Sequence, residues 1–250
     1  MNVAPNRPPD PGLRFVGGEP VDYTASRSIY PSPALVADGF LSAGENRRLL
    51  QAALAHEAEF VWTTTTTRAE HYRASRVLFG FPECEGLIRT RVAAVLPEVV
   101  RRFRIRGFVP GAIEAQLTFH GDGHYYKVHN DNGSAKTAAR VLSYVYYFCR
   151  EPARFRGGEL RIYDAAALGG RWKRGSTSYR IAPKNNRIVF FLSRYHHEVL
   201  PVVCPSRRFV DGRFTINGWI RKKEQQIVRG VPPSRRTARF RPSLRPRSGA

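Results

Sequence analysis

The stretch FHGDGHYYKVHND, residues Phe119–Asp131, is a strand-like run that ends on an imidazole and a carboxylate two residues apart, His129 and Asp131. A second stretch, YHHEVLPV at Tyr195–Val202, carries another imidazole at His197. Apolar, β-branched and aromatic residues beside a Gly-Asp-Gly turn signal are typical of short strands. We therefore predict two strands of a β-fold, each of which presents part of one site.

The chain around these stretches repeats the pattern of short strands and turns. The predicted strands are Phe60–Thr67, Tyr72–Phe79, Arg104–Val109, Glu114–His120, Tyr125–His129, Arg140–Cys149, Glu159–Tyr163, Tyr179–Ala182, Arg187–Leu192, His197–Val203 and Arg213–Arg221. The strands after Phe103 have no helix between them, which indicates an all-β barrel or a double-sheet roll. The run Val141–Cys149 is apolar on both faces, as the central strand of a sheet would be.

Two helices are predicted ahead of the main run of strands. Ser42 and Glu45 have the capping-box spacing, which opens a helix over residues 43–57. Apolar residues recur at helical spacing over residues 88–99, where Pro97 predicts a kink or a break. These helices can cover one face of the β-fold.

The composition along the chain predicts three parts. Residues 1–38 are rich in Pro, Gly and Asp, so we expect a mostly irregular N-terminal arm with a short strand over Asp22–Ile29. Residues 39–224 form a single domain in this interpretation. Residues 225–250 turn to Arg, Pro and Ser without an apolar period, which is typical of a basic, disordered tail.

The overall composition is that of a globular protein, with 42% hydrophobic and 24% charged residues. No apolar run has the length needed to span a bilayer, and the first residues lack the pattern of a secretory signal. Three cysteines, Cys84, Cys149 and Cys204, have no metal-finger spacing and make an odd number. We therefore expect reduced thiols and a cytoplasmic protein.

The net charge of +21 is unevenly distributed. Residues 221–250 hold ten Lys or Arg against one acid, while residues 41–220 hold 28 Lys or Arg against 15 Asp or Glu. A basic field attracts anions such as nucleic acid, an acidic protein or an anionic cosubstrate. An Arg-rich, solvated surface without a partner remains the alternative.

His129 and Asp131 are one of three pairs in which an acid follows a histidine by two residues. The others are His120 with Asp122, in a Gly-flanked turn, and His196 with Glu198. A mobile turn holds metal ligands poorly, whereas a strand that enters a turn can aim both side chains at one point. Two imidazoles and one carboxylate, with open positions opposite them, suit ferrous iron.

Further motifs follow in order along the chain. They are Tyr126–Asp131, Arg140–Tyr147, Gly157–Tyr163, Pro183, Phe190–Phe191, His197–Val202, and Arg213 six residues before Trp219. In this order they resemble the prolyl 4-hydroxylase-like branch of the iron(II)/2-oxoglutarate-dependent dioxygenases, over residues 40 to 221. The resemblance implies a mainly β fold with supporting helices, the double-stranded β-helix, a cupin-like jelly roll.

Carried over by position, the resemblance makes His129, Asp131 and His197 the iron ligands. It implies that Arg213 binds 2-oxoglutarate and that the phenol of Tyr147 donates to the same carboxylate. The interval between His197 and Arg213 is longer than in the family, which leaves Arg207 and Arg208 as rivals. For substrate binding the predicted residues are Tyr126, Arg73 and Trp219. The segment Thr63–Arg76, which contains Arg73, resembles the variable strand and loop that cover substrate in such enzymes.

The implied reaction is hydroxylation of an unactivated C–H bond, with Fe(2+), 2-oxoglutarate and O2, release of succinate and CO2, and L-ascorbate as a reductant. The nearest family substrate is a prolyl residue of a peptide or protein, or an amino-acid-like small molecule. Two other functions stay open: a nucleic-acid-directed oxidative demethylase, suggested by the basic charge, and a non-catalytic basic binding module on the same fold. We also expect weak polyanion or nucleic-acid binding by the tail, and no membrane partner.

Overall fold

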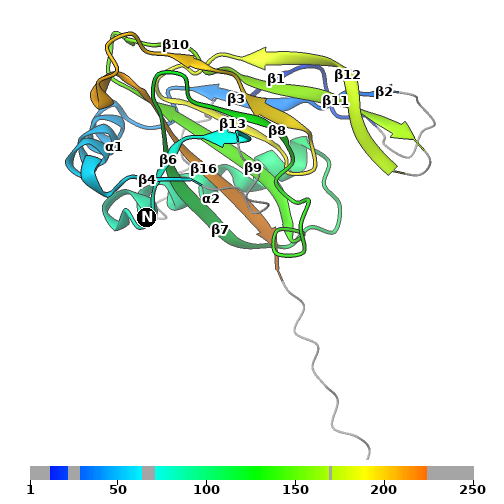
Figure 1. Ribbon diagram of the computed structural model, residues 1–250. Helices are drawn as coiled ribbons and strands as arrows, with labels where there is room; N and C mark the ends of the chain where they lie inside the picture. The colour runs from blue at the N-terminus through cyan, green and yellow to red at the C-terminus, as the bar shows by residue number, and fades with distance from the viewer. Residues whose placement is uncertain (1–11, 22–28, 64–70, 169–170, 224–250) are drawn as a thin grey trace, which may run out of the picture.

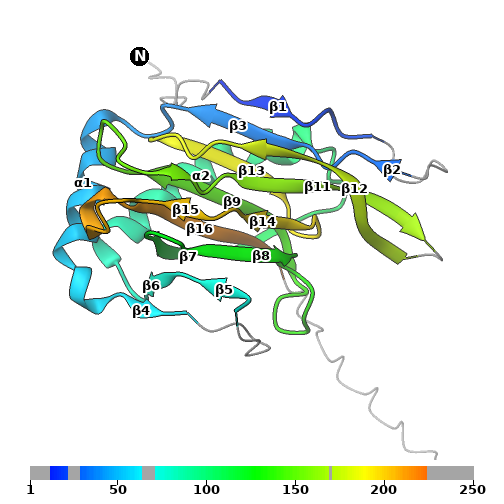
Figure 2. The same cartoon turned by 45° about the horizontal axis from the view of Figure 1, so that its top comes forward.

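The computed structural model describes residues 12–21, 29–63, 71–168 and 171–223. Two antiparallel sheets face each other, and two helices cover the outer face of the larger sheet (Figure 1). The smaller sheet comes forward in Figure 2, where β8 and β14 lie over β9 and β16. This double-sheet jelly roll with helical support confirms the predicted fold class.

The larger sheet has eight strands. In spatial order they are β1 (Arg14–Val16), β3 (Ala34–Asp38), β13 (Arg187–Leu192), β9 (Arg140–Phe148), β16 (Arg213–Lys222), β7 (Pro110–His120), β6 (Arg76–Leu78) and β4 (Val61–Trp62). Strand β9 lies between β13 and β16 and is buried from Leu142 to Phe148, which confirms the prediction of a central strand.

The smaller sheet and a separate strand pair complete the roll. The order of the smaller sheet is β12 (Arg171–Ile181), β11 (Leu160–Leu168), β14 (His197–Val199), β8 (Tyr125–His129) and β5 (Arg73–Ala74), with β2 (Ile29–Tyr30) paired to β11. Strand β10 (Arg156–Gly157) pairs with β15 (Val202–Val203). The segment predicted as one strand, Tyr72–Phe79, therefore divides at Ser75, since β5 joins the smaller sheet and β6 the larger one.

Helix α1 (Ala43–Ala55) begins with the predicted capping box. Ser42 Oγ accepts from the backbone N–H of Glu45, and the Glu45 carboxylate accepts from the backbone N–H of Ser42. Its buried face includes Leu49 and Ala53. The helix ends two residues before the predicted limit, and a 3-10 turn, η1 (Glu57–Glu59), follows.

Helix α2 (Pro82–Arg102) is longer than predicted and continues through Pro97. The prediction of a break was therefore wrong. Ile88, Val92 and Val99 are fully buried, and this apolar burial outweighs the one backbone hydrogen bond that proline cannot donate. No helix in the described ranges has both the length and the apolar character needed to cross a membrane.

The end of the predicted N-terminal arm is regular, because β3 pairs with β13 and the side chains of Ala34–Ala37 are buried. One predicted strand is missing from the described residues. The strand over Arg104–Val109 is absent, because Arg104 and Gly107 have φ of 55° and 63°, which turn the chain before β7. The tail over residues 225–250, and parts of the strands predicted at Asp22–Ile29 and Phe60–Thr67, lie outside the described residues.

Candidate metal centre

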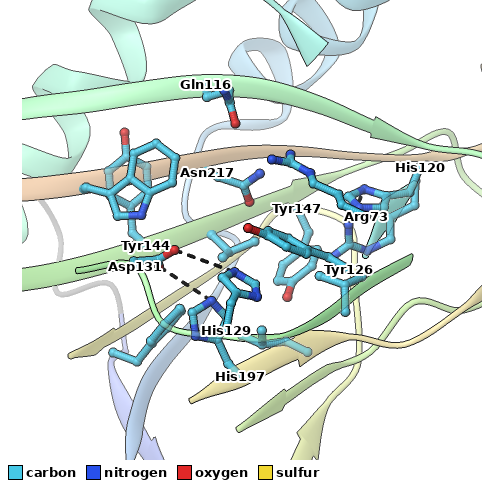
Figure 3. Close-up of a pocket in the computed structure, with 16 residues that line it drawn as sticks. Arg73, Gln116, His120, Tyr126, His129, Asp131, Tyr144, Tyr147, His197 and Asn217 are labelled. Atoms are coloured by element: carbon cyan, nitrogen blue, oxygen red, sulfur yellow. Dashed lines mark hydrogen bonds and ion pairs between the residues drawn. The ribbon is translucent and has the colours of Figure 1, made fainter. Parts of the chain in front are cut away.

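Three side chains from the smaller sheet converge on one point (Figure 3). His129 ends β8, Asp131 follows it by two residues, and His197 begins β14 directly opposite His129 in the sheet register. The Nε2 atoms of His129 and His197 lie 3.7 Å and 3.5 Å from the two carboxylate oxygens of Asp131. The three potential ligand atoms all lie within 4.8 Å of one another, a spacing that one metal ion can bridge.

The hydrogen bonds of the two imidazoles fix which nitrogen faces this point. His129 Nδ1 lies 2.8 Å from the carbonyl oxygen of Lys127, and His197 Nδ1 lies 2.9 Å from that of Tyr195. A carbonyl oxygen only accepts, so each Nδ1 carries the hydrogen and each Nε2 presents a lone pair. Burial, with the neighbouring His197, lowers the pKa of His129 to about 3, which keeps its ring neutral.

Asp131 is oriented from the larger sheet. Ser143 Oγ on β9 donates to its carboxylate at 2.6 Å, and the Asp131 backbone N–H donates to the Ser193 carbonyl at 2.9 Å. Burial alone would raise the pKa of Asp131, but the two imidazoles and hydrogen bonds from Ser143 and Trp219 outweigh it and lower that pKa. The site therefore offers two imidazole nitrogens and one carboxylate, which fits ferrous iron with positions left open.

A buried guanidinium lies in the same cavity as these three residues. This guanidinium belongs to Arg213, which is 2% exposed. Its Nη1 donates a hydrogen bond to His120 Nδ1 at 3.1 Å, and its guanidinium carbon lies 5.0 Å from the centre of the Tyr147 ring. Since His120 Nδ1 accepts, its Nε2 carries a hydrogen. That Nε2, the Arg213 Nε and the Thr215 hydroxyl are buried without a hydrogen-bond partner in the described residues.

A buried group that lacks its hydrogen bond costs on the order of 1–3 kcal/mol. Three such groups, one of them on the Arg213 guanidinium itself, indicate a place for an acceptor with negative charge. The guanidinium of Arg213 can bind a carboxylate through two parallel hydrogen bonds. The deep end of the cavity therefore fits one carboxylate of 2-oxoglutarate.

The two rival arginines do not line this cavity. The Arg207 side chain is 81% exposed and pairs with Asp122, and the Arg208 side chain is 63% exposed and pairs with Asp211. Both lie in the longer connection before β16, which includes the 3-10 turn η2 (Phe209–Asp211). This connection lies at the surface, whereas Arg213 is the first residue of β16 and is buried.

All three residues predicted to bind substrate line the cavity: Arg73, Tyr126 and Trp219. The Tyr126 ring stacks on that of His129, with centroids 3.6 Å apart and an interplanar angle of 18°. The Arg73 guanidinium carbon lies 4.7 Å from the Tyr126 ring centre. These contacts place Tyr126 and Arg73 side by side next to His129 in the lining of the cavity (Figure 3).

Four polar residues at the site were not identified from the sequence: His120, Ser143, Gln116 and Asn217. The pair His120–Asp122 was noted only as a weaker metal pair, yet His120 contacts Arg213 and Asp122 contacts the backbone of Cys204. Gln116 and Asn217 are opposite each other on β7 and β16. The alternation of β7 places Gln116, Thr118 and His120 on one face, which is the signal that could have identified them.

Residues 115–221 match the family described as the 2OG-Fe(II) oxygenase superfamily. An uncharacterised PKHD-type hydroxylase of Synechocystis sp. is 44% identical over 216 residues, which are 85% of this chain and 71% of that protein. Among solved structures, a prolyl-4-hydroxylase of Pseudomonas putida has a TM-score of 0.53 at 21% identity, covering 76% of this chain and 93% of the other. A Trichoplax adhaerens prolyl hydroxylase, solved with a hypoxia inducible factor peptide fragment, has a TM-score of 0.58 at 17% identity, covering 76% and 83%.

Proposed function

Because the chain belongs to the 2OG-Fe(II) oxygenase superfamily, we propose that it hydroxylates an unactivated C–H bond with release of succinate and CO2. It is a hydroxylating oxidoreductase that uses Fe(2+), 2-oxoglutarate and O2. In this proposal His129, Asp131 and His197 bind the iron, and Arg213 and Tyr147 bind 2-oxoglutarate. The substrate is a prolyl residue of a peptide or protein, or an amino-acid-like small molecule.

One observation carries this proposal. Two imidazole Nε2 atoms and a carboxylate converge in a cavity whose other end holds a buried guanidinium among unsatisfied hydrogen-bond donors. A metal and a dicarboxylate would complete both ends at once. A binding module without catalysis would have no need of either arrangement.

Iron, when bound with 2-oxoglutarate and O2, supplies the oxidising power for C–H hydroxylation. The protein supplies geometry and an environment with little water. Ser143 and Ser193 hold Asp131, and backbone carbonyls hold the two imidazoles, so the ligands need little rearrangement on binding. Leu160, Phe191 and Val199 give the cavity apolar walls, which strengthen the pairing of charges inside it.

The proposed binding of iron and 2-oxoglutarate is tested by anaerobic addition of Fe(2+) and 2-oxoglutarate to the apoprotein. A weak visible charge-transfer band is expected from the chelate, and Asp131→Ala should abolish both the band and turnover. Circular dichroism of the variant should show an intact fold. A folded wild-type protein that gives no band contradicts the proposal.

The prolyl assignment draws support from the hydroxylase relative and from the likeness of fold to prolyl hydroxylases. Its test measures succinate formation with proline-containing peptides, free amino acids and methylated single-stranded nucleic acid, with mass spectrometry for the gain of one oxygen. Hydroxyproline would support it. Turnover with methylated nucleic acid alone, releasing formaldehyde, would favour the demethylase.

The basic tail has a separate proposed role in weak polyanion binding. Its arginines lie in a sequence without apolar periodicity, which favours salt-dependent electrostatic contacts. Deleting residues 226–250 should leave succinate formation unchanged and reduce retention on a polyanion column at low salt. Equal retention of both proteins would refute this role.

A further inference from the structure

Arg73 places a second positive charge in the cavity, in addition to that of Arg213. It lies on β5 directly opposite Tyr126 of β8, the strand that also carries His129. Its guanidinium lies over the Tyr126 ring, and that ring stacks on His129. One aromatic ring therefore separates this cation from a proposed metal ligand (Figure 3).

This guanidinium has no carboxylate partner among the described residues. Its Nε donates to Ser75 Oγ at 2.7 Å, and burial lowers the pKa of Arg73, an effect that Tyr126 and Asp131 oppose. Three other partly buried arginines are arranged differently. Each of the following faces an acid: Arg140 with Glu114, Arg161 with Glu198, and Arg187 with Asp38.

Tyr126 does not supply the missing negative charge. A phenol is protonated at neutral pH, so Tyr126 offers a hydroxyl group and not an anion. Asp131 is already held by Ser143 and directed at the two imidazoles. Neither neighbour is therefore a dedicated partner for Arg73.

The charges expected in the loaded site leave Arg73 unbalanced. Fe(2+) with Asp131 has a net charge of +1, and adding Arg213 makes it +2, which the two carboxylates of 2-oxoglutarate neutralise. The histidines add nothing, because they are neutral when they bind a metal. One positive charge remains in a largely dry cavity, where an unpaired ion is costly.

We infer that Arg73 binds a carboxylate of the substrate, so that the substrate is an anionic amino acid or a peptide with an acidic group close to the oxidised carbon. This inference rests on the proposed function. Only the Tyr126 ring lies between Arg73 and His129. When the substrate carboxylate binds Arg73, a substrate carbon a few bonds away from that carboxylate therefore lies beside the metal. The carboxylate comes from one of two sources, the α-carboxylate of a free or C-terminal residue or the side chain of Asp or Glu.

The test compares acids with matched amides on protein loaded with Mn(2+) and 2-oxoglutarate. The first set of probes contains the common free and N-acetylated amino acids, each as the acid and as the primary amide. The second set contains proline peptides with a neighbouring Asp or Glu, each compared with the same peptide carrying Asn or Gln. Paramagnetic broadening of probe resonances reports binding near the metal without turnover. Free acids and acidic peptides form separate arms, which distinguish the two sources.

At least one acid should bind tenfold or more tightly than its amide, and Arg73→Gln should abolish that preference. Arg73→Lys, which keeps the charge, should retain part of it. Arg76→Gln is the matched control, since Arg76 lies three residues further along, on β6, and its guanidinium contacts Phe119 and Phe209 outside this cavity. The control should behave as the wild type.

Equal binding of acids and amides, a preference that survives Arg73→Gln, or no binding by any probe would overturn the inference. Mn(2+) and 2-oxoglutarate affinities are measured first on each variant. If the wild-type protein binds neither Mn(2+) nor 2-oxoglutarate, the proposed function itself is refuted. If it binds both but shows no preference for acids over amides, only the role of Arg73 is refuted.

Discussion

The hydroxyl of Ser143 lies 2.6 Å from a carboxylate oxygen of Asp131 and 2.9 Å from the hydroxyl of Ser193. Asp131 lies two residues after β8 of the smaller sheet and Ser143 lies on β9 of the larger one, so this contact links the two sheets at the candidate metal centre. Ser143 is 1% exposed, and water cannot readily replace its hydrogen bond. The orientation of the carboxylate is therefore set before any metal binds.

Replacing this hydroxyl should weaken metal binding more than it affects folding. Ser143→Ala should lower the affinity for Fe(2+) or Mn(2+) by about 10–100-fold, the usual effect of losing a group that orients a metal ligand. Metal titration followed by electron paramagnetic resonance measures this. Ser134→Ala, which removes a hydroxyl bonded to Thr137, is the control. Equal affinities in the two variants would refute the positioning role.

Gly158 offers a second route to the cosubstrate site. It has φ of +69°, and an added Cβ would lie 2.8 Å from both Arg213 Cδ and Val202 Cγ2. Gly158→Ala should therefore displace the Arg213 side chain and raise the 2-oxoglutarate concentration needed for half-maximal binding, by roughly tenfold or more for a loss of about 1.4 kcal/mol.

Gly123→Ala separates this effect from backbone strain. Gly123 has φ of +75°, but its added Cβ would have no atom within 4 Å. Both alanines adopt an unfavourable left-handed conformation, which costs on the order of 1–3 kcal/mol of stability. Calorimetry should show weaker 2-oxoglutarate binding only for the Gly158 variant. The same change in both variants would mean that strain, and not contact with Arg213, is responsible.

The clustering of the three proposed metal ligands could be predicted from the sequence because their geometry is local or set by strand pairing. His129 and Asp131 lie two residues apart, and His197 begins the strand that pairs with β8. Ser143 and His120 were not predicted, because their contacts depend on how two sheets face each other and on the register of β16 with β7. A single sequence does not define either arrangement.

In the fold, too, features set by local sequence were predicted and features set by distant pairing were not. The central strand β9 was predicted from its two apolar faces, whereas β3 was missed although Ala34–Ala37 is a short apolar run between Pro33 and Gly39. Such a run has no period that separates strand from irregular chain. Its strand conformation follows from pairing with β13, about 150 residues later in the sequence.

That same strand pair makes stability depend on pH. The Arg187 hydrogen bonds to Asp38, at 2.6 and 3.0 Å, lower the pKa of this carboxyl from 3.8 to about 2. A lowered folded-state pKa stabilises the fold above the unfolded value, and the contribution is lost as pH falls from about 4 to 2. Asp38→Asn should therefore be less stable than the wild type at pH 7 in urea unfolding. The difference should shrink towards pH 2, and a constant difference would contradict this linkage.

The deep end of the cavity gives the sharpest prediction on 2-oxoglutarate. Removing one partner of a buried ion pair costs about 3–5 kcal/mol, so Arg213→Gln should reduce 2-oxoglutarate affinity by at least about a hundredfold. Arg213→Lys keeps the charge but loses the planar fork, and its affinity should lie between those of the wild type and the Gln variant. Arg207→Ala removes an exposed arginine and should leave binding unchanged. A large loss in the Arg207 variant, with normal binding by Arg213→Gln, would transfer the cosubstrate site to the surface loop.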